Sequence, residues 1–132
     1  MTGRASRFYI KADSNKVYLE HLQIIMNSLD IVDECVAVKR PNDEELYDTK
    51  VFVKLKNGIE PTEDLKNYIY LSLDGLTPNG STRPLKSFEM PASIEFVDRI
   101  KRIQDSEKID YRYYEIEAQK EYEEQKKRRK RY

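Results

Sequence analysis

Few side chains in this sequence belong to the types that do chemistry in small clusters. Cys35 is the only cysteine and His21 the only histidine. A single thiol excludes an internal disulfide framework and a zinc site built on thiolates. A single imidazole argues against a histidine-based metal centre and against a catalytic triad. Cys35 lies in an apolar run, which predicts a small core residue rather than a nucleophile. The sequence therefore predicts no metal ligands. Any catalytic role would have to be filled by charged side chains.

Charge is abundant and unevenly distributed. The 132 residues include 24 Lys and Arg and 24 Asp and Glu, so the formal net charge is zero although 36% of the chain is charged. Residues 126–131 are all basic, and the first 125 residues hold 18 cations and 24 anions, a net charge of −6. In so lysine-rich a chain an individual lysine is ordinarily a solvated surface residue. Residue type alone thus assigns no role to Lys108.

The size and hydropathy of the chain set its class. A chain of 132 residues with 39% apolar side chains forms one domain with a modest core. No apolar run approaches the roughly 20 residues that span a bilayer, and the polar, basic start at residues 1–7 lacks the apolar stretch of a secretion signal. These features predict a cytoplasmic protein without a membrane partner.

The first half of the chain shows hairpin, helix and strand patterns. Two short β-prone runs, 8–11 and 16–18, flank turn residues and predict a hairpin. Apolar residues at helical spacing then predict a helix that ends at Asp30, with Leu19, Leu22, Met26 and Leu29 on its buried face. Runs 35–38 and 51–55 predict two strands, with an exposed acidic connection over 41–48.

The second half adds two helices and one strand. Thr62 is placed to cap a helix that Gly75 closes, with Leu65, Ile69, Leu73 and Leu76 on its buried face. Residues 77–91 hold three prolines and predict a long loop. A third strand is expected at Ile94 and Phe96, and a last helix from Tyr111, whose buried face carries Tyr111, Tyr114, Ala118 and Tyr122. The fold expected is α+β: a small mixed three-stranded sheet with helices packed on it, a short N-terminal hairpin before it and a long helix at the end.

The order of five short motifs carries the functional signal. They are Thr2-Gly3-Arg4, Lys16-Val17-Tyr18, the segment 32–38, the segment 94–98 and Lys108-Ile109-Asp110-Tyr111-Arg112. This series resembles the C-terminal domain of the adenylate-forming enzymes, which include acyl- and aryl-CoA synthetases, peptide-synthetase adenylation domains and luciferases. The resemblance covers residues 1–115, with hinge and hairpin in 1–18, and leaves 116–132 as a charged helical extension with a basic tail.

The resemblance implies a two-step activity. Such enzymes activate a carboxylic acid with ATP and Mg to an acyl-adenylate, then pass the acyl group to a thiol of coenzyme A or a carrier protein. Their large N-terminal domain holds the phosphate loop and the acid pocket, and the small C-terminal domain swings between two poses. This sequence has no glycine-rich phosphate loop. The expected partner is therefore an N-terminal adenylation domain, in the same or a separate chain, and we expect no activity and no tight cofactor binding without it.

Lys108 stands where the family's catalytic lysine stands. A fixed ammonium there would stabilise charge that develops on phosphate and carboxylate oxygens. The sequence departs from the family around it, because Glu107 replaces a glycine, residues 101–103 replace a proline and threonine pattern, and the loop is one residue longer. Glu107 could pair with Lys108 and draw it away from the phosphate.

The hinge and hairpin depart from the family as well. Ser6 occupies the pivot, which usually carries Asp or Lys, and Arg4 precedes it as in the family. Lys16 aligns with a family arginine, and Ser14 with a glycine that lies near the thiol tunnel. Arg4, Lys16 and Ser14 are therefore candidate contacts to the nucleotide or the thiol. Ser14 and Asn15 are also ordinary turn residues, so a purely structural role stays open.

A second hypothesis is a module that has lost catalysis and binds a protein or a nucleic acid through its last helix and basic tail. Tyrosines and Arg112 would form that surface. The acidic residues between them would repel phosphates, which disfavours a nucleic acid. The alternative without a binding partner is that the terminal cations complement the helix dipole and remain solvated.

Overall fold

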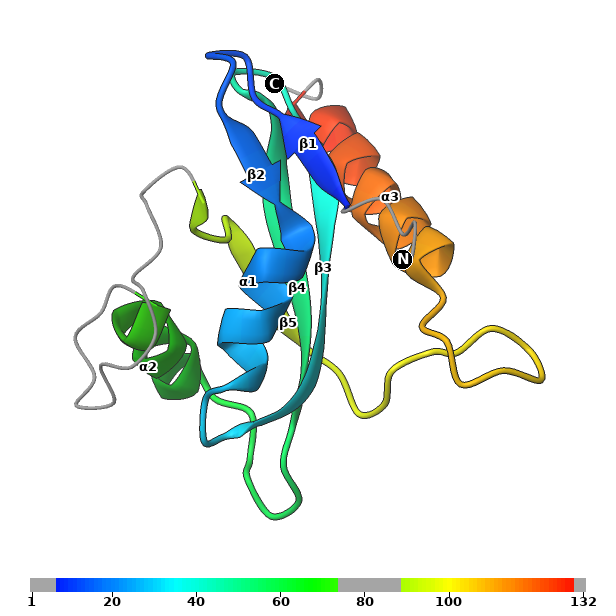
Figure 1. Ribbon diagram of the computed structural model, residues 1–132. Coiled ribbons are helices and arrows are strands. Elements are labelled where there is room, and N and C mark those ends of the chain that lie inside the picture. Colours follow the sequence, from blue (N-terminus) through cyan, green and yellow to red (C-terminus); the bar gives the residue numbers. More distant parts are fainter. Residues whose placement is uncertain (1–6, 74–88, 130–132) are drawn as a thin grey trace.

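A three-stranded sheet forms the centre of the molecule (Figure 1). The computed structural model describes residues 7–73 and 89–129. Strands β3 (Val32–Asn42) and β4 (Leu46–Leu55) pair in antiparallel fashion, and β5 (Ser93–Phe96) adds to the other edge of β4 in parallel. The sheet is mixed, as the sequence predicted.

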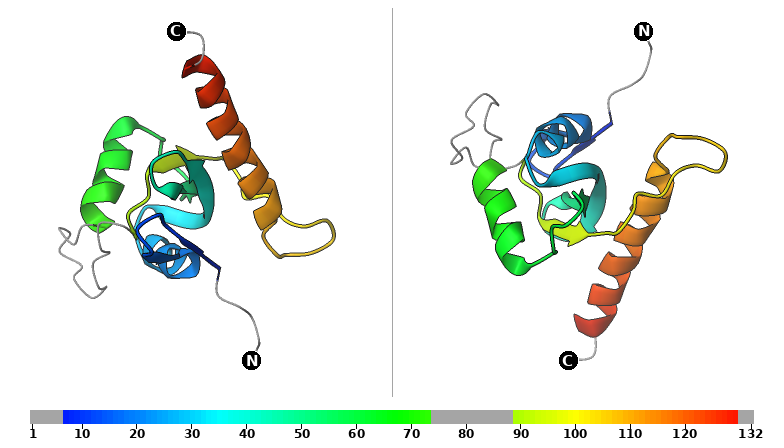
Figure 2. Two further views of the ribbon diagram at one scale, coloured as in Figure 1. Left: turned by 90° about the horizontal axis from the view of Figure 1, so that it is seen from above. Right: turned by 90° about the horizontal axis from the view of Figure 1, so that it is seen from below.

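Helices cover both faces of this sheet (Figure 2). Helices α1 (Leu19–Asn27) and α2 (Glu63–Leu73) lie on one face, and α3 (Tyr111–Arg129) crosses the other. Because successive strand residues point to opposite faces, Cys35, Ala37, Val51 and Val53 join the core under α1, whereas Val36, Val38 and Phe52 join the core under α3. The predicted α+β class is confirmed.

The N-terminal hairpin packs on one end of the sheet. Strands β1 (Phe8–Ile10) and β2 (Lys16–Tyr18) pair in antiparallel fashion, with Tyr9 opposite Val17. Those two side chains are buried in the core under α1. The backbone N–H of Ala12 donates to the carbonyl oxygen of Glu45 over 2.9 Å, which ties the hairpin to the β3–β4 turn.

The predicted helices are confirmed with small changes at their ends. Helix α1 buries Leu19, Leu22 and Met26 as expected but ends at Asn27, three residues before Asp30, because the N–H groups of Ser28 and Leu29 bond three residues back in a tighter turn. Thr62 caps α2 by accepting a hydrogen bond from the N–H of Leu65 over 3.2 Å. Gly75, Leu76 and most of the predicted 77–91 loop lie outside the described residues.

One prediction is wrong. Residues 41–48 were expected to form an exposed connection, but β3 and β4 run through most of it and the turn is confined to residues 43–45. Asp48 is buried in β4, with 4% of its surface exposed. Pro41 is tolerated because β3 is an edge strand, the position in a sheet to which proline is largely confined. Strands β3 and β4 continue beyond their apolar residues, because the charged residues that follow pair with one another across the two strands.

The last helix matches its prediction. Helix α3 begins at Tyr111, and Tyr114 and Ala118 are its fully buried residues, with Tyr111 and Tyr122 partly covered. No helix in residues 7–73 and 89–129 combines the length and apolar character needed to cross a bilayer.

Candidate functional site

Lys108 lies on a loop that precedes α3 and projects from the body of the domain (Figure 1). We call residues 101–110 the Lys108 loop. An antiparallel bridge between Arg102 and Ile109 joins its two legs. The N–H of Ile103 donates to the oxygen of Lys108 over 2.9 Å, and the N–H of Asp110 donates to the oxygen of Lys101 over 3.0 Å. The loop is therefore a small hairpin whose backbone conformation is defined.

The tip of the loop accommodates the extra residue and leaves Lys108 accessible. Asp105 adopts a left-handed conformation with φ of 60°, and Ser106 Oγ accepts a hydrogen bond from the N–H of Lys108 over 3.0 Å. Lys108 is exposed, and in the described part of the chain it forms no ion pair, with Glu107 or any other acid. Its ammonium keeps all three donors for an anionic partner.

Two contacts hold the base of the loop. The buried Tyr114 hydroxyl accepts a hydrogen bond from the N–H of Lys101 over 2.7 Å. Burial raises the pKa of the Tyr114 hydroxyl above its ordinary value of 10.0. Arg102 Nη2 lies 2.7 Å from both carboxylate oxygens of Glu34 on β3. The loop thus projects from a fixed base.

Ser14 sits at the turn of the N-terminal hairpin, and its backbone has φ of 73°. Its N–H donates to the oxygen of Lys11 over 2.9 Å, and Asp13 Oδ1 accepts from the N–H of Asn15 over 3.1 Å. Left-handed backbone is what glycine adopts most readily, so this position has the conformation expected where the family carries glycine. Ser14 is also a turn residue, as the structural alternative proposed.

Lys16 and the hinge residues complete the predicted set. Lys16 is exposed on β2, with its Nζ 5.5 Å from the centroid of the Phe8 ring. Arg4 and Ser6 lie outside the described residues. The structure brings Ser14 and Lys16 together on the hairpin, but Lys108 lies on a separate projection (Figures 1 and 2). The candidates therefore occupy two surfaces rather than one site.

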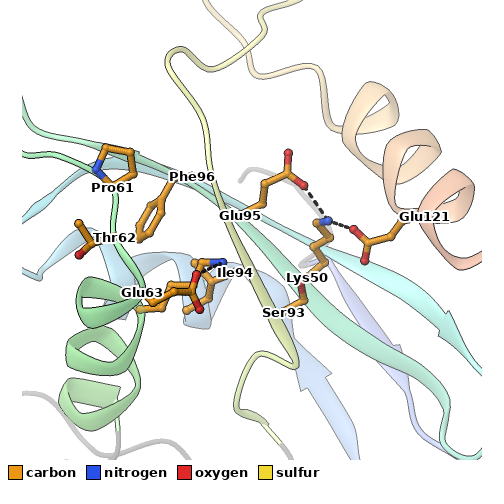
Figure 3. Close-up of a pocket in the computed structure, with 10 residues that line it drawn as sticks. Lys50, Pro61, Thr62, Glu63, Ser93, Ile94, Glu95, Phe96 and Glu121 are labelled. Atoms are coloured by element: carbon orange, nitrogen blue, oxygen red, sulfur yellow. Dashed lines mark hydrogen bonds and ion pairs between the residues drawn. The ribbon is translucent and has the colours of Figure 1, made fainter. Parts of the chain in front are cut away.

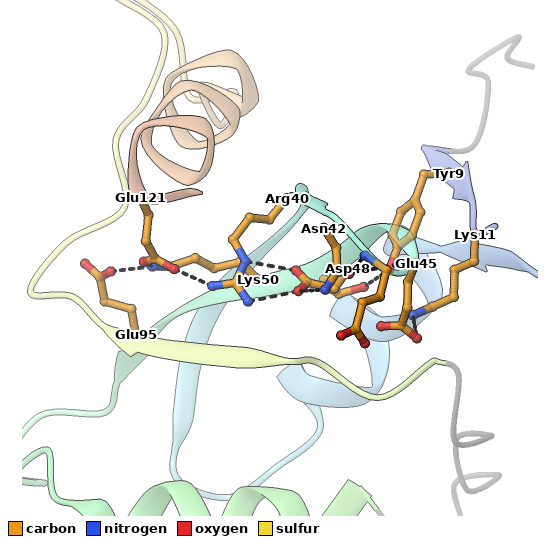
Figure 4. Close-up of polar contacts among 11 residues, drawn as sticks. Tyr9, Lys11, Arg40, Asn42, Glu45, Asp48, Lys50, Glu95 and Glu121 are labelled. Atoms are coloured by element: carbon orange, nitrogen blue, oxygen red, sulfur yellow. Dashed lines mark hydrogen bonds and ion pairs between the residues drawn. The ribbon is translucent and has the colours of Figure 1, made fainter. Parts of the chain in front are cut away.

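A cluster that sequence reasoning missed lies between the sheet and α3 (Figure 4). This ion cluster comprises Arg40, Asp48, Lys50, Glu95 and Glu121. Arg40 Nε and Nη2 lie 2.9 and 3.0 Å from the two carboxylate oxygens of Asp48, and Lys50 Nζ lies 2.8 Å from Glu95 Oε1. Glu121 of α3 contacts both Arg40 and Lys50.

The ion cluster holds two cations and three carboxylates, so its formal net charge is −1 and both of its cations are already paired. Burial opposes ionisation of Glu121, but its bonds to Lys50 and Arg40 outweigh that cost and lower the pKa of this carboxyl. A groove of about 500 Å³ lies beside the cluster, between β5, the start of α2 and α3 (Figure 3). The Lys50 ammonium at its wall is already held by Glu95 and Glu121. The Nζ of Lys66, the other lysine of the lining, lies 3.2 Å from Glu63 Oε2. Both cations are therefore engaged, and the groove is poorly suited to a phosphate.

Cys35 and His21 are the remaining residues that the sequence analysis considered. Cys35 is fully buried, and burial raises the pKa of its thiol to about 12, which confirms a core residue. His21 is half-buried on α1. Among the residues that the structure describes, no group of His, Cys, Asp and Glu is arranged to hold a metal ion.

Comparison with known proteins adds a family likeness at the level of structure. No protein-family model matches the sequence, and no curated protein does either. The chain superposes on an acyl-CoA synthetase from Brucella canis with a TM-score of 0.72 and 20% identity, over 88% of this chain and 20% of that one. Nearly all of this chain thus shares the fold of about a fifth of that synthetase. The predicted resemblance to the C-terminal domain of the adenylate-forming enzymes is confirmed at this level.

Two other solved structures share this fold. One is ATP-bound MatB from Rhodopseudomonas palustris, with a TM-score of 0.70, 19% identity, and coverage of 87% of this chain and 20% of that one. The other is an anthranilate CoA ligase in complex with anthranoyl-AMP, with a TM-score of 0.65, 19% identity, and coverage of 86% and 23%. The chain thus spans about a fifth of the length of the structures it matches.

Proposed function

We propose that this chain acts as the mobile C-terminal domain of an ATP-dependent carboxylate ligase. Such a ligase forms an acyl-adenylate and then transfers the acyl group to a thiol such as that of coenzyme A. The observation that carries the proposal is that nearly all of this chain has the fold of one fifth of an acyl-CoA synthetase. The chain would need an N-terminal adenylation domain, in the same or a separate chain, to bind the carboxylic acid, ATP and Mg. It is inactive alone.

Lys108 would serve the adenylation step. As pyrophosphate leaves, negative charge develops on oxygens around the α-phosphorus, and a positioned ammonium stabilises it. An exposed Lys108 on a loop with a fixed base can enter a neighbouring active site without first breaking an ion pair. Glu107 does not hold it back in this conformation.

The hairpin would serve the thiol step. Ser14 and Lys16 lie there, and Arg4 belongs to the segment just before it. Because Ser14 and Lys16 occupy a different projection from Lys108, a rotation about Ser6 could present each surface in turn to one active site (Figure 1). Residues 1–115 form the unit that alternates in this scheme, and residues 116–132 extend it.

The hairpin also offers a surface for the adenylation domain. Its outer face carries Phe8, Ile10 and Tyr18, which are 47%, 45% and 42% exposed, and Phe8 and Tyr18 pack against each other with ring centroids 5.7 Å apart. A partner that covers this face would remove apolar surface from water.

Replacement of Lys108 tests the proposal. In the ligase with its adenylation domain, Lys108→Ala should reduce ATP–pyrophosphate exchange by a factor on the order of 100. Thioester formation from supplied acyl-adenylate should stay within about threefold, since the lysine acts before that step. Lys101→Ala is a matched control, because Lys101 is exposed on the same loop. Unchanged exchange in Lys108→Ala would refute the role.

A second candidate function rests on the end of α3. Residues 123–128 are exposed throughout, which leaves a charged helical segment available to a protein or nucleic acid. A chain truncated after Glu124 should then lose partner binding, and binding to a nucleic acid should weaken steeply with salt. A partner that binds the truncated chain equally well would eliminate this function.

A further inference from the structure

Arg7 connects three segments that are far apart in the sequence. Its Nη1 donates to Gln23 Oε1 on α1 over 2.9 Å, and its Nη2 donates to the oxygen of Ala37 on β3 over 2.6 Å. The guanidinium carbon lies 3.7 Å from the centroid of the Tyr111 ring on α3. One half-buried side chain therefore contacts α1, β3 and α3 at once.

Gln23 completes the arrangement. Its Oε1 also accepts a hydrogen bond from the N–H of Ala37 over 3.0 Å, and its Nε2 donates to the Tyr111 hydroxyl over 3.3 Å. Both ends of the amide are engaged, so its orientation is fixed. We call Arg7, Gln23 and Tyr111 the Arg7 cluster. Within it, Arg7 contacts the face of the Tyr111 ring and Gln23 contacts its hydroxyl.

Tyr111 stands at the base of the Lys108 loop. It is the first residue of α3 and directly follows Asp110, whose N–H bonds to Lys101 across the two legs. The N–H of Tyr111 donates to the oxygen of Ile109 over 3.1 Å. Movement of Tyr111 would therefore displace the leg that carries Lys108, three residues earlier.

We propose that Arg7 is a positioning residue that holds the Lys108 loop in a fixed orientation through Gln23 and Tyr111. The functional meaning rests on the proposed function, in which Ser6 is the pivot and Lys108 the catalytic lysine. Arg7 follows the pivot directly, so a rotation there carries the Lys108 loop as part of one rigid body. A planar guanidinium suits this position, because two of its nitrogens donate in different directions while its face stacks on the ring, and the compact ammonium of a lysine lacks that geometry.

A role confined to general stability makes a different prediction from a positioning role. General destabilisation would speed amide exchange across the whole domain, including the central strands β3 and β4. Loss of positioning would speed exchange at the loop amides, notably those of Ile103 and Asp110, and leave the strands protected. Amide hydrogen exchange of the chain, measured by NMR without ATP or a partner, separates the two.

In this measurement Arg7→Ala and Arg7→Lys should both raise exchange of the Ile103 and Asp110 amides about tenfold, with less than a twofold change in β3 and β4. Lys16→Ala, an exposed cation of the adjacent hairpin, is the control and should leave the loop unchanged. Protected loop amides in Arg7→Ala, or an equal increase in loop and strands, would overturn the proposal.

Variants at Tyr111 keep the test decisive if Arg7→Ala does not fold. Tyr111→Leu removes the ring against which Arg7 stacks and should raise loop exchange as Arg7→Ala does, whereas Tyr111→Phe retains the ring and should restore protection to within about threefold of the native chain. Equal exchange in the two variants would refute the stacking role. Because no catalysis is measured, failure here is distinct from failure of Lys108→Ala in pyrophosphate exchange.

Discussion

The two faces of the central sheet are built on different principles. The face under α1 and α2 is mainly apolar, with Ala37, Val51 and Val53 all fully buried and Thr49 as a buried polar residue that is hydrogen-bonded to Tyr9. The face under α3 begins in the same way, with Val36, Val38 and Phe52, and then continues as the ion cluster. One sheet therefore holds one helix layer by hydrophobic burial and the other by burial and ion pairs together.

The strand period explains how the two chemistries share one face. Along β3 the residues Val36, Val38 and Arg40 point to α3, and they pair across the sheet with Phe52, Lys50 and Asp48. The alternation continues while the residue type changes from apolar to charged. Burial of the charged part is tolerable because both cations are paired within the sheet and contacted again by Glu121 from α3. No described buried side-chain polar atom lacks a hydrogen-bond partner.

Truncation of Met26 should break the apolar face. Met26 is 0% exposed between α1 and the sheet, so Met26→Ala should lower the free energy of unfolding by about 3 kcal/mol through lost burial and a residual cavity. Urea denaturation measures the change. Ile24→Ala on the same helix, where the side chain is 69% exposed, is the control and should change stability by about 0.5 kcal/mol or less. Equal losses in the two variants would contradict the packing described for α1.

Neutralisation of Glu121 should weaken the charged face by less. Glu121→Gln leaves Lys50 with Glu95 and Arg40 with Asp48, so neither cation becomes unpaired. Since the Glu121 side chain is also 28% exposed, we expect a loss of about 1–2 kcal/mol, below the range for breaking a fully buried pair. Glu117→Gln, which removes an exposed pair with Lys120, should cost about 0.5 kcal/mol or less in the same urea experiment.

The same variant makes a prediction about pH. Because the folded-state pKa of Glu121 is below its ordinary value of 4.5, its ionised form stabilises the fold fully above that pH. The contribution is lost as pH falls from 4.5 through the lower folded-state pKa. The difference in unfolding free energy between the native chain and Glu121→Gln should therefore be constant at neutral pH and shrink on acidification. A difference that stays constant down to pH 2 would contradict the ion pairs at Glu121.

The apolar parts of the fold could be predicted from the sequence, whereas the charged part of the sheet could not. Apolar periodicity identified α1, α2 and α3, and it identified β3 and β4 where they contribute apolar residues. It failed at 41–48, because Arg40, Asp48 and Lys50 carry no apolar signal and their partners Glu95 and Glu121 are distant in sequence. Pairing between distant charges is a property of the folded chain.

The candidate site divides in the same way. Motif order placed Lys108 on the loop before α3 and Ser14 at a hairpin turn, and the structure has both residues there. It gave no sign of the Arg7 cluster, because Arg7, Gln23 and Tyr111 are separated by up to about a hundred residues and fit no local pattern. Local motifs can indicate where chemistry lies, but the contacts that orient it depend on the topology.

The smallest effect concerns the hairpin, which extends the apolar face through Tyr9 and Val17. Ser14 holds φ of 73°, a conformation that costs a residue with a side chain roughly 1–2 kcal/mol, whereas glycine adopts it freely and loses roughly 0.5–1 kcal/mol of chain entropy instead. Ser14→Gly should therefore raise the free energy of unfolding by about 0.5 kcal/mol, measured in urea. Ser14→Ala retains the Cβ and should give no gain. If the alanine variant gained as much as the glycine variant, the backbone of this turn would not be the source of strain, and the likeness between Ser14 and a family glycine would lose its physical basis.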